Sequence, residues 1–147
     1  MQLTPDTKTI LAKPAVAAGS TDITDATVID TSGYEGVRFI FSFGTITAGA
    51  ATSVLVAGKA TSPPVLGTDD LVGTSITVAD SGDDKIYIID IHKPLQRYIL
   101  PIVKRATQNA VLNSIVAELY GPSKAPVTAH SSVGAQELHI SPAVGTA

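Results

Sequence analysis

The sequence predicts an all-β protein, either a single antiparallel β-sandwich or a jelly-roll-like barrel, with extended N- and C-terminal arms. The stretch from about Asp22 to Tyr120 is rich in Thr, Val and Ile, whose branched side chains suit a pleated strand better than a helix. Clusters of Gly, Asp, Ser and Pro divide this stretch into short segments, as turns do between strands. Several of the segments alternate apolar and polar residues with the period of two that a strand requires.

A chain of 147 residues has the length of one domain. We assign the β core to residues 20–121, and we predict an N-terminal arm over 1–19 and a C-terminal arm over 122–147, because neither end shows a regular apolar period. Such ends are usually frayed tails. The alternative is that the two arms become ordered against a neighbouring subunit. Leu138 and Ile140 favour this alternative, because on a free tail these apolar side chains would have nothing to pack against.

The strongest strand signal lies at residues 37–43. All three phenylalanines of the chain recur there at every second position, on one face with Val37. This stripe predicts the centre of the core. The full set of predicted strands is 20–29, 37–43, 53–59, 71–79, 85–91, 97–103 and 109–120.

The remaining strands are predicted from shorter patterns. The strand at 53–59 is expected to point Val54 and Val56 inward. The apolar residues carried by 20–29 are Ile23 and Val28, and those carried by 71–79 are Val72, Ile76 and Val78. Segment 85–91 is apolar at almost every position, so we expect both of its faces to be buried. Pro101 interrupts segment 97–103. Since proline lacks an amide donor, it predicts an edge position or a bulge.

The last segment, 109–120, closes the predicted core. As a strand it places Ile115, Ala117 and Leu119 on one face, and it places Leu112, Val116 and Tyr120 on the other. Residues 110–119 also fit a helix, and the pattern alone leaves both interpretations open.

Composition excludes several classes of function. The formal net charge of −3 offers no general attraction for nucleic-acid phosphates. The chain has no cysteine, which excludes disulfides and zinc–thiolate sites. No apolar run reaches the ~18 residues of a membrane helix, and the first residues do not resemble a signal peptide. We therefore expect synthesis in the cytoplasm and neither a nucleic-acid nor a membrane partner.

The candidate catalytic groups are scattered. His92, His130 and His139 lie far apart in the sequence, so we predict surface or interface roles for them. Glu35 and Glu118 have no feature that places them together as a glycosidase pair requires. The sequence therefore predicts no enzyme and no catalytic residue.

Two motifs with a superficial likeness to ligand sites were also considered. Residues 58–61 resemble the end of a phosphate loop, but Ser53 and Ala60 stand where a glycine and a hydroxyl residue belong. An acidic group gives a solvated turn, with a calcium site as the alternative; its members are Asp69, Asp70, Asp80, Asp83 and Asp84. We predict no cofactor and no metal ligand.

Three stretches resemble small structural proteins of tailed bacteriophages, of the kind that decorate or cement the capsid. They are Ile29-Asp30-Thr31-Ser32-Gly33-Tyr34-Glu35-Gly36, then Lys93-Pro94-Leu95-Gln96-Arg97-Tyr98-Ile99, then Ala117-Glu118-Leu119-Tyr120-Gly121-Pro122 followed by Leu138-His139-Ile140-Ser141-Pro142-Ala143. The resemblance extends from about Thr27 to Ala147.

These stretches also have a physical interpretation. The Asp-Thr-Ser-Gly cluster at 30–33 turns the chain. Tyr34 suits a rim or an interface because its ring has a polar tip. Arg97 is placed to pair with a carboxylate across a sheet edge.

The resemblance implies a virion protein that binds the outer capsid surface and stabilises the shell. Its expected partners are the major capsid protein and further copies of itself, as a dimer or trimer, and its expected location is the capsid surface. Alternatives are a neck, tail-completion or fibre component of the virion, or a carbohydrate-binding β-sandwich. The sugar-binding alternative is weakened because only 5% of the residues are aromatic and none is Trp.

Overall fold

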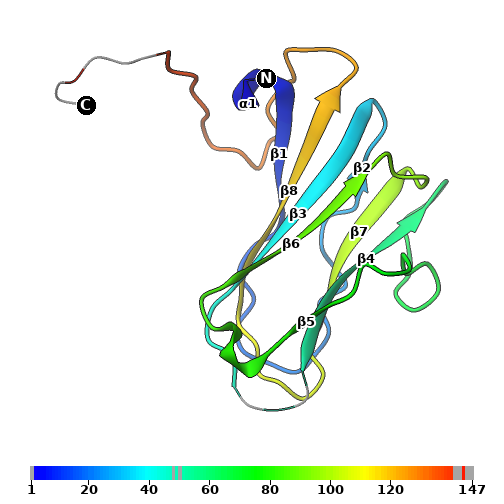
Figure 1. Ribbon diagram of the computed structural model, residues 1–147, viewed down its shortest axis with the longest axis vertical. Coiled ribbons are helices and arrows are strands. Elements are labelled where there is room, and N and C mark those ends of the chain that lie inside the picture. The colour runs from blue at the N-terminus through cyan, green and yellow to red at the C-terminus, as the bar shows by residue number, and fades with distance from the viewer. Residues whose placement is uncertain (1, 48, 50, 141–143, 145–147) are drawn as a thin grey trace.

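Two four-stranded antiparallel sheets pack face to face in the computed structural model (Figure 1). The structure describes residues 2–47, 49, 51–140 and 144. The first sheet has the order β1-β8-β3-β6 and the second β2-β7-β4-β5. The elements are α1 (Leu3–Asp6), β1 (Thr7–Lys13), β2 (Ile29–Asp30), β3 (Tyr34–Phe43), β4 (Thr52–Lys59), β5 (Ile76–Val78), the 3-10 helix η1 (Asp80–Gly82), β6 (Ile86–His92), β7 (Tyr98–Lys104) and β8 (Leu112–Pro122).

The predicted all-β class and the sandwich form are confirmed. No strand among the described residues belongs to both sheets, and they do not close into a barrel.

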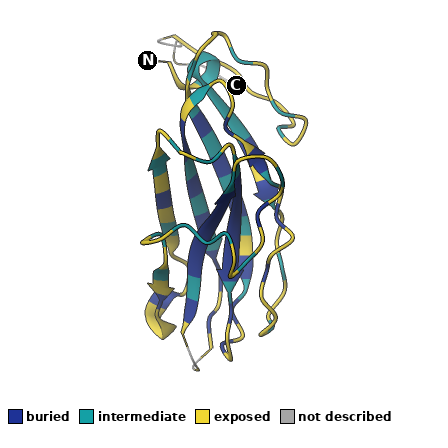
Figure 2. Ribbon diagram, turned by 90° about the vertical axis from the view of Figure 1, so that its right-hand side faces the viewer, coloured by how far each residue is buried: buried dark blue, intermediate teal, exposed yellow. Residues whose placement is uncertain are grey.

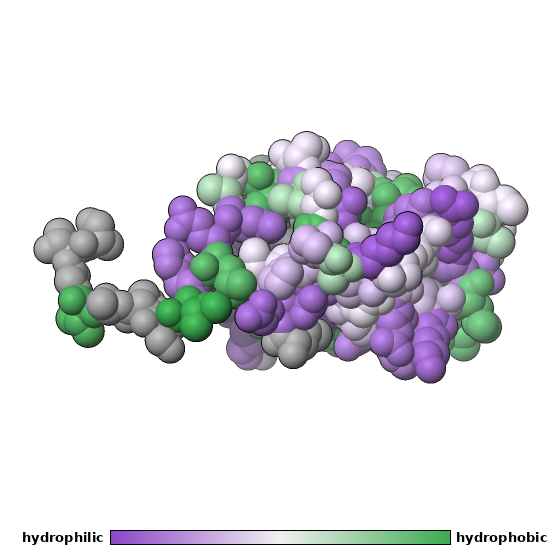
Figure 3. Space-filling view, turned by 90° about the horizontal axis from the view of Figure 1, so that it is seen from above, coloured by the Kyte–Doolittle hydropathy of each residue, from purple (hydrophilic) through white to green (hydrophobic). Residues whose placement is uncertain are grey.

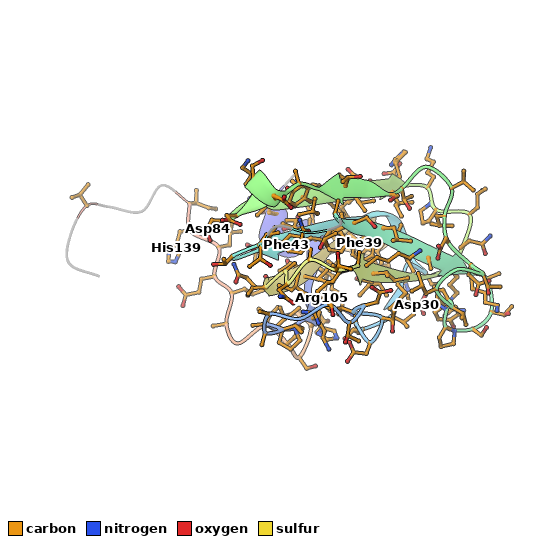
Figure 4. The ribbon with its side chains drawn as sticks, turned by 90° about the horizontal axis from the view of Figure 1, so that it is seen from below. Asp30, Phe39, Phe43, Asp84, Arg105 and His139 are labelled. Carbon is orange, nitrogen blue, oxygen red and sulfur yellow. The ribbon has the colours of Figure 1, made fainter. Side chains whose placement is uncertain are left out.

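The phenylalanine stripe of β3 fills the space between the sheets. Phe39, Phe41 and Phe43 are fully buried, and Figure 4 shows Phe39 and Phe43 between the two layers. Tyr87 of β6 meets the Phe43 ring edge-on, with 5.7 Å between the ring centres. The second sheet contributes the buried Val54 and Val56 and their neighbours from β7. The predicted centre of the core is therefore confirmed.

Residues 112–122 form a strand, so the helix alternative for this segment is wrong. Ile115, Ala117 and Leu119 are buried as predicted. Leu112 was expected on the opposite face, but it too is fully buried. The register with β3 shifts there, because Ser42 pairs with Ser114 while Phe43 pairs with Leu112. One extra residue in β8 reverses the alternation and turns Leu112 inward.

Pro101 lies in β7, which has neighbours on both sides in the second sheet. It pairs with Val56 of β4, whose N–H and C=O bond to Thr74 and Leu71 on the far side of β4. By the antiparallel alternation, the nitrogen of Pro101 then points away from β4. On that side the pairing stops at Ile29↔Ile99 and resumes at Ile23↔Val103. The proline therefore occupies a local gap in the ladder, where no amide donor is needed.

The prediction of an N-terminal arm over residues 1–19 is wrong in part, because this range contains strand β1. Thr7–Lys13 pairs along β8, and its Ile10 and Ala12 are buried. The periodicity was weak because an edge strand of this length needs few apolar residues on its inner face. The rest of the predicted arm has no strand over residues 14–19 apart from a bridge at Val16.

Three further strand predictions are wrong in part. Within residues 20–29 only Ile29, the first residue of β2, belongs to a strand, although Ile23 forms a bridge to Val103 and is buried. Residues 71–79 contain only the three residues of β5, and Val72 is fully exposed. In β6, Ile86 and Ile88 are exposed, because an edge strand of the first sheet has a covered inner face and an open outer one.

Arg105 holds the segment before β2 against the end of the sandwich (Figure 4). Its side chain is buried and donates to the carbonyl oxygens of Ala17, Thr21 and Ala110, at 2.7, 2.6 and 3.1 Å. Its backbone N–H donates to Asp22 at 3.0 Å. A planar guanidinium with several donors suits this convergence of carbonyls better than a lysine ammonium would.

The C-terminal segment first follows β1 and then leaves the sandwich (Figure 1). Val127 donates its N–H to the carbonyl of Pro5 at 2.9 Å, and Ser132 accepts from the N–H of Leu11 at 3.0 Å. Residues 123–140 contain no strand or helix. The part of the predicted arm at 141–143 and 145–147 lies outside the described residues.

Replacing Phe41 by Ala should lower the free energy of unfolding by about 3–5 kcal/mol, because it leaves a cavity at the centre of the core. Chemical denaturation monitored by circular dichroism measures this change. The control Val72→Ala, at a fully exposed position, should change the value by less than about 0.5 kcal/mol. A Phe41→Ala loss no larger than that of the control would contradict the assigned core.

Replacing Arg105 by Met should lower the free energy of unfolding by about 2–4 kcal/mol, since several buried hydrogen bonds disappear together. Amide exchange at Ile23, whose N–H bonds to Val103, should accelerate as the segment loosens. Arg38→Met is the matched control, because Arg38 is half-exposed and pairs only at the surface. Unchanged exchange at Ile23 in the Arg105 variant would show that Arg105 does not hold the segment.

Candidate interaction surface

The outer face of the second sheet is covered by the chain itself. The loop between β4 and β5 bonds Asp69 to Lys59 at 3.4 Å and brings Asp70 within 3.6 Å of Lys104. Pro64 of the same loop is buried. Figure 2 looks onto this side, where loops cross strands coloured as buried. The aliphatic residues that face outward from this sheet are consequently buried, and they are Leu55, Ala57, Leu100 and Ile102.

The outer face of the first sheet has a different character, and we call it the open face. Its residues are the outward-pointing ones of the four strands, arranged in cross-strand rows. One row is entirely aliphatic and crosses the whole sheet, and it consists of Leu11, Val116, Ile40 and Ile88. Leu11 and Ile88 are exposed, while Val116 and Ile40 are half-buried. Antiparallel sheets usually present polar side chains on an outer face, so this row marks a surface suited to contact with another protein.

The next row of the open face is charged. Arg38 of β3 donates to Glu118 of β8, with Nε and Nη2 at 3.0 and 2.7 Å from the same carboxylate oxygen. Thr9 and Asp90 complete this row on β1 and β6. The charges are therefore already partly paired within the sheet, which lowers the desolvation cost of covering them with a partner.

An aromatic row follows. The rings of His92 and Tyr120 stack with 6.3 Å between their centres and a 3° angle. They belong to strands on either side of β3, and the residue between them is Gly36. A Cβ at Gly36 would lie 2.3 Å from Tyr120, so only glycine permits this arrangement. The Tyr120 hydroxyl donates to Asp90 at 2.8 Å. Burial, followed by this hydrogen bond, raises the pKa of Tyr120 to about 12.

The segments 29–36, 93–99 and 117–122, which carry the resemblance described above, meet at one end of the sandwich. Thr31 donates its N–H to the carbonyl of Arg97 at 2.9 Å, and Ser123 donates its N–H to Gly33 at 2.8 Å. A hollow of about 390 Å³ lies between the first two stretches. Its lining residues are Thr31, Ser32, Tyr34, Glu35, Lys93, Pro94, Leu95 and Arg97.

The carboxylate partner expected for Arg97 is Asp30. The guanidinium binds it through two hydrogen bonds, of 2.9 Å from Nε and 2.7 Å from Nη2. This hydrogen bonding by Arg97, aided by the N–H of Ser32, lowers the pKa of Asp30 below its usual value. Tyr34 is half-buried at the rim of the hollow, and its burial raises its pKa.

The three histidines are not brought together. His92 lies at the end of β6, 3.7 Å from Glu35. His130 bonds to Ser132 in the C-terminal segment, and His139 bonds to Glu137 at 2.9 Å. The Ser132 hydroxyl and the His130 imidazole are close neighbours in the sequence, and the same hydroxyl oxygen accepts from the N–H of Leu11. His92 and His139 are exposed, and His130 is half-buried.

Four of the five acidic residues named for a calcium site accept hydrogen bonds from the protein itself. Asp83 accepts from the N–H of Ile46 at 2.7 Å, and Asp80 accepts from the buried amide of Gln108. Asp69 and Asp70 accept from backbone amides in their own loop. Over the described residues no group of three or more His, Cys, Asp or Glu side chains is arranged to hold a metal ion.

The candidate residues for a phosphate loop and for a glycosidase pair do not form those sites either. Gly58 and Lys59 belong to the extended strand β4 and form no phosphate-binding turn. Glu118 is bound by Arg38 on the open face, while Glu35 lies beside His92.

Among the described residues, no helix is long and apolar enough to cross a membrane. Neither a protein-family model nor a curated protein matches this sequence.

The Arg97–Asp30 pair predicts a pH-dependent contribution to stability. The pKa of Asp30 is lower in the folded protein than in the unfolded chain, so the pair stabilises the fold at pH values above about 4. That contribution disappears as the pH falls through the folded pKa. The difference in melting temperature between wild type and Asp30→Asn should therefore be largest near neutral pH and shrink below pH ~4.

Thermal melts from neutral pH to about pH 2.5 measure this dependence. In the Arg97→Gln background, adding Asp30→Asn should have little further effect at any pH. A difference that persists unchanged in acid, or in the Arg97→Gln background, would show that the pair is not its source.

Proposed function

We propose that this chain is a non-enzymatic structural protein of a tailed-bacteriophage particle, which binds the outer surface of the capsid and stabilises the shell. The observation that carries the proposal is the open face, with its aliphatic row from Leu11 to Ile88. A surface of this kind fits contact with a broad protein surface. The three stretches that resemble virion proteins support the same assignment.

The partner that we propose is the major capsid protein. The row Leu11, Val116, Ile40 and Ile88 would bury its aliphatic side chains against that partner, and burial favours binding by roughly 25 cal/mol for each Å² of apolar surface. Arg38 and Glu118 remain paired beside it, so they fix orientation without adding an unpaired charge.

The mechanism is thermodynamic linkage. A protein that binds the assembled shell, and not its free subunits, lowers the free energy of the assembled state alone. Many copies act on one particle, and a modest affinity at each site is then sufficient. Such a role needs a rigid scaffold and a complementary surface, and it needs no reactive group.

Quantitative mass spectrometry of purified phage particles tests the location. We expect the chain in a copy number comparable with that of the major capsid protein. A copy number near that of a single portal ring would assign it to the neck or tail, and its absence from particles would overturn the proposal.

Binding of the purified protein to particles that lack it tests the surface. Ile40→Asp should weaken binding at least about tenfold, because it places an unpaired charge at the centre of the apolar row. The matched control is Val65→Asp, at an exposed residue of the loop between β4 and β5. Circular dichroism confirms folding of both variants, and equal binding by both would exclude the open face as the contact.

A further inference from the structure

Strand β6 leaves one edge of the first sheet unpaired. It is the last strand of the order β1-β8-β3-β6, and within the part of the chain that the structure describes β3 is its one pairing partner. The hydrogen bond from Phe43 N–H to the carbonyl of Lys85 sets the phase of that ladder. Because antiparallel strands alternate inward and outward amides, Ile86, Ile88 and Asp90 direct their N–H and C=O groups away from β3.

Between Ile86 and Ile89 this edge has no charged side chain to discourage strand pairing. β6 has seven residues in unbroken register, without a proline or a bulge. Its Ile86 and Ile88 side chains are 58% and 43% exposed. Natural proteins usually shorten, bend or cover such an edge. The opposite edge of the same sheet is covered, because Ser132 of the C-terminal segment accepts from the N–H of Leu11.

The C-terminal segment of the same chain carries two apolar side chains that are exposed to solvent. Leu138 and Ile140 are 48% and 78% exposed and stand at alternate positions, as in a strand. Figure 3 shows hydrophobic residues along the part of the C-terminal segment that projects from the body. Among the described residues of this segment, the hydrogen bond of His139 is to Glu137, two residues away.

We infer that the C-terminal segment around residues 137–140 of one copy adds as a strand to β6 of a second copy. Backbone hydrogen bonds to Ile86 and Ile88 would supply affinity, and the alternate side chains would supply specificity. Leu138 and Ile140 would then extend the aliphatic row of the open face beyond Ile88. This inference does not depend on the proposed capsid role.

The segment's position favours a second copy over its own β6. It leaves the sandwich beside β1, which is three strand spacings, or about 14 Å, from β6 across the open face. In Figure 1 it projects away from the sheets. To pair with β6 of the same chain, the segment would have to reverse its direction and cross the width of the open face.

Analytical ultracentrifugation of the full chain, over a range of concentrations and without particles, tests the inference. The wild type should self-associate. Ile88→Pro should weaken association at least about tenfold, because it removes an outward N–H that β3 does not use. Leu138→Asp combined with Ile140→Asp should do the same from the other side of the contact. Val72→Asp is the control and should associate as the wild type does.

Engineered cysteines provide a second measurement if Ile88→Pro does not fold. The chain has no cysteine of its own. Ile88→Cys and a size-tagged Leu138→Cys, mixed under oxidising conditions, should form a disulfide-linked heterodimer. Val72→Cys mixed with the same tagged partner is the matched control and should form far less of it.

Three outcomes would overturn the inference. One is a wild-type chain that stays monomeric at every concentration. Another is a yield of Ile88–Leu138 heterodimer no higher than that of the Val72 control. The third is a double variant, Ile88→Cys with Leu138→Cys, that closes within a single chain and not between chains. Because particle binding is measured separately, none of these results decides the proposed function.

Discussion

The antiparallel register between β3 and β8 controls the distribution of residues in this molecule. Both strands lie at the centre of the first sheet, and they pair from Tyr34↔Pro122 to Phe43↔Leu112. That register buries the phenylalanine stripe and points Arg38 and Glu118 together to the outside. A slip by one residue would exchange the faces of one strand and bury a charge in the core. The aliphatic row on the open face is a consequence of the same register.

The two sheets share a core but differ in what covers their outer faces. The loop after β4 covers the second sheet and ties itself down through Lys59 and Lys104. On the first sheet, α1 and the C-terminal segment lie beside Thr9 and Glu118, whereas Leu11 and Ile88 of the aliphatic row are exposed. The outer face of the second sheet is therefore covered by loops, whereas the first sheet presents an apolar row and an open edge at β6. The proposed binding role and the inferred self-association both rest on this asymmetry.

The long interior strands could be predicted from the sequence, whereas β1 and the burial of the edge strand β6 could not. The Phe39–Phe43 alternation is visible because a strand covered on one face repeats its apolar residues every two positions. β1 was not predicted, because its inner face buries only Ile10 and Ala12, which are too few to show an apolar period. The burial of β6 was overestimated because its sequence is apolar on both faces, at Ile86 and Ile88 as well as at Tyr87 and Ile89, whether the outer face is covered or open. The bulge that buries Leu112 is likewise a property of the pairing with β3.

The sequence by itself determined the all-β class, the buried phenylalanine stripe, the turn at 30–33 and a carboxylate partner for Arg97. These features depend on local alternation and on the chemistry of neighbouring residues. Only the tertiary structure decided that His92 and Tyr120 stack across Gly36, that one aliphatic row spans four strands, and that β6 ends the sheet. The physical reason is that strand order and register join residues far apart in the chain, and no local pattern encodes which strand lies beside which.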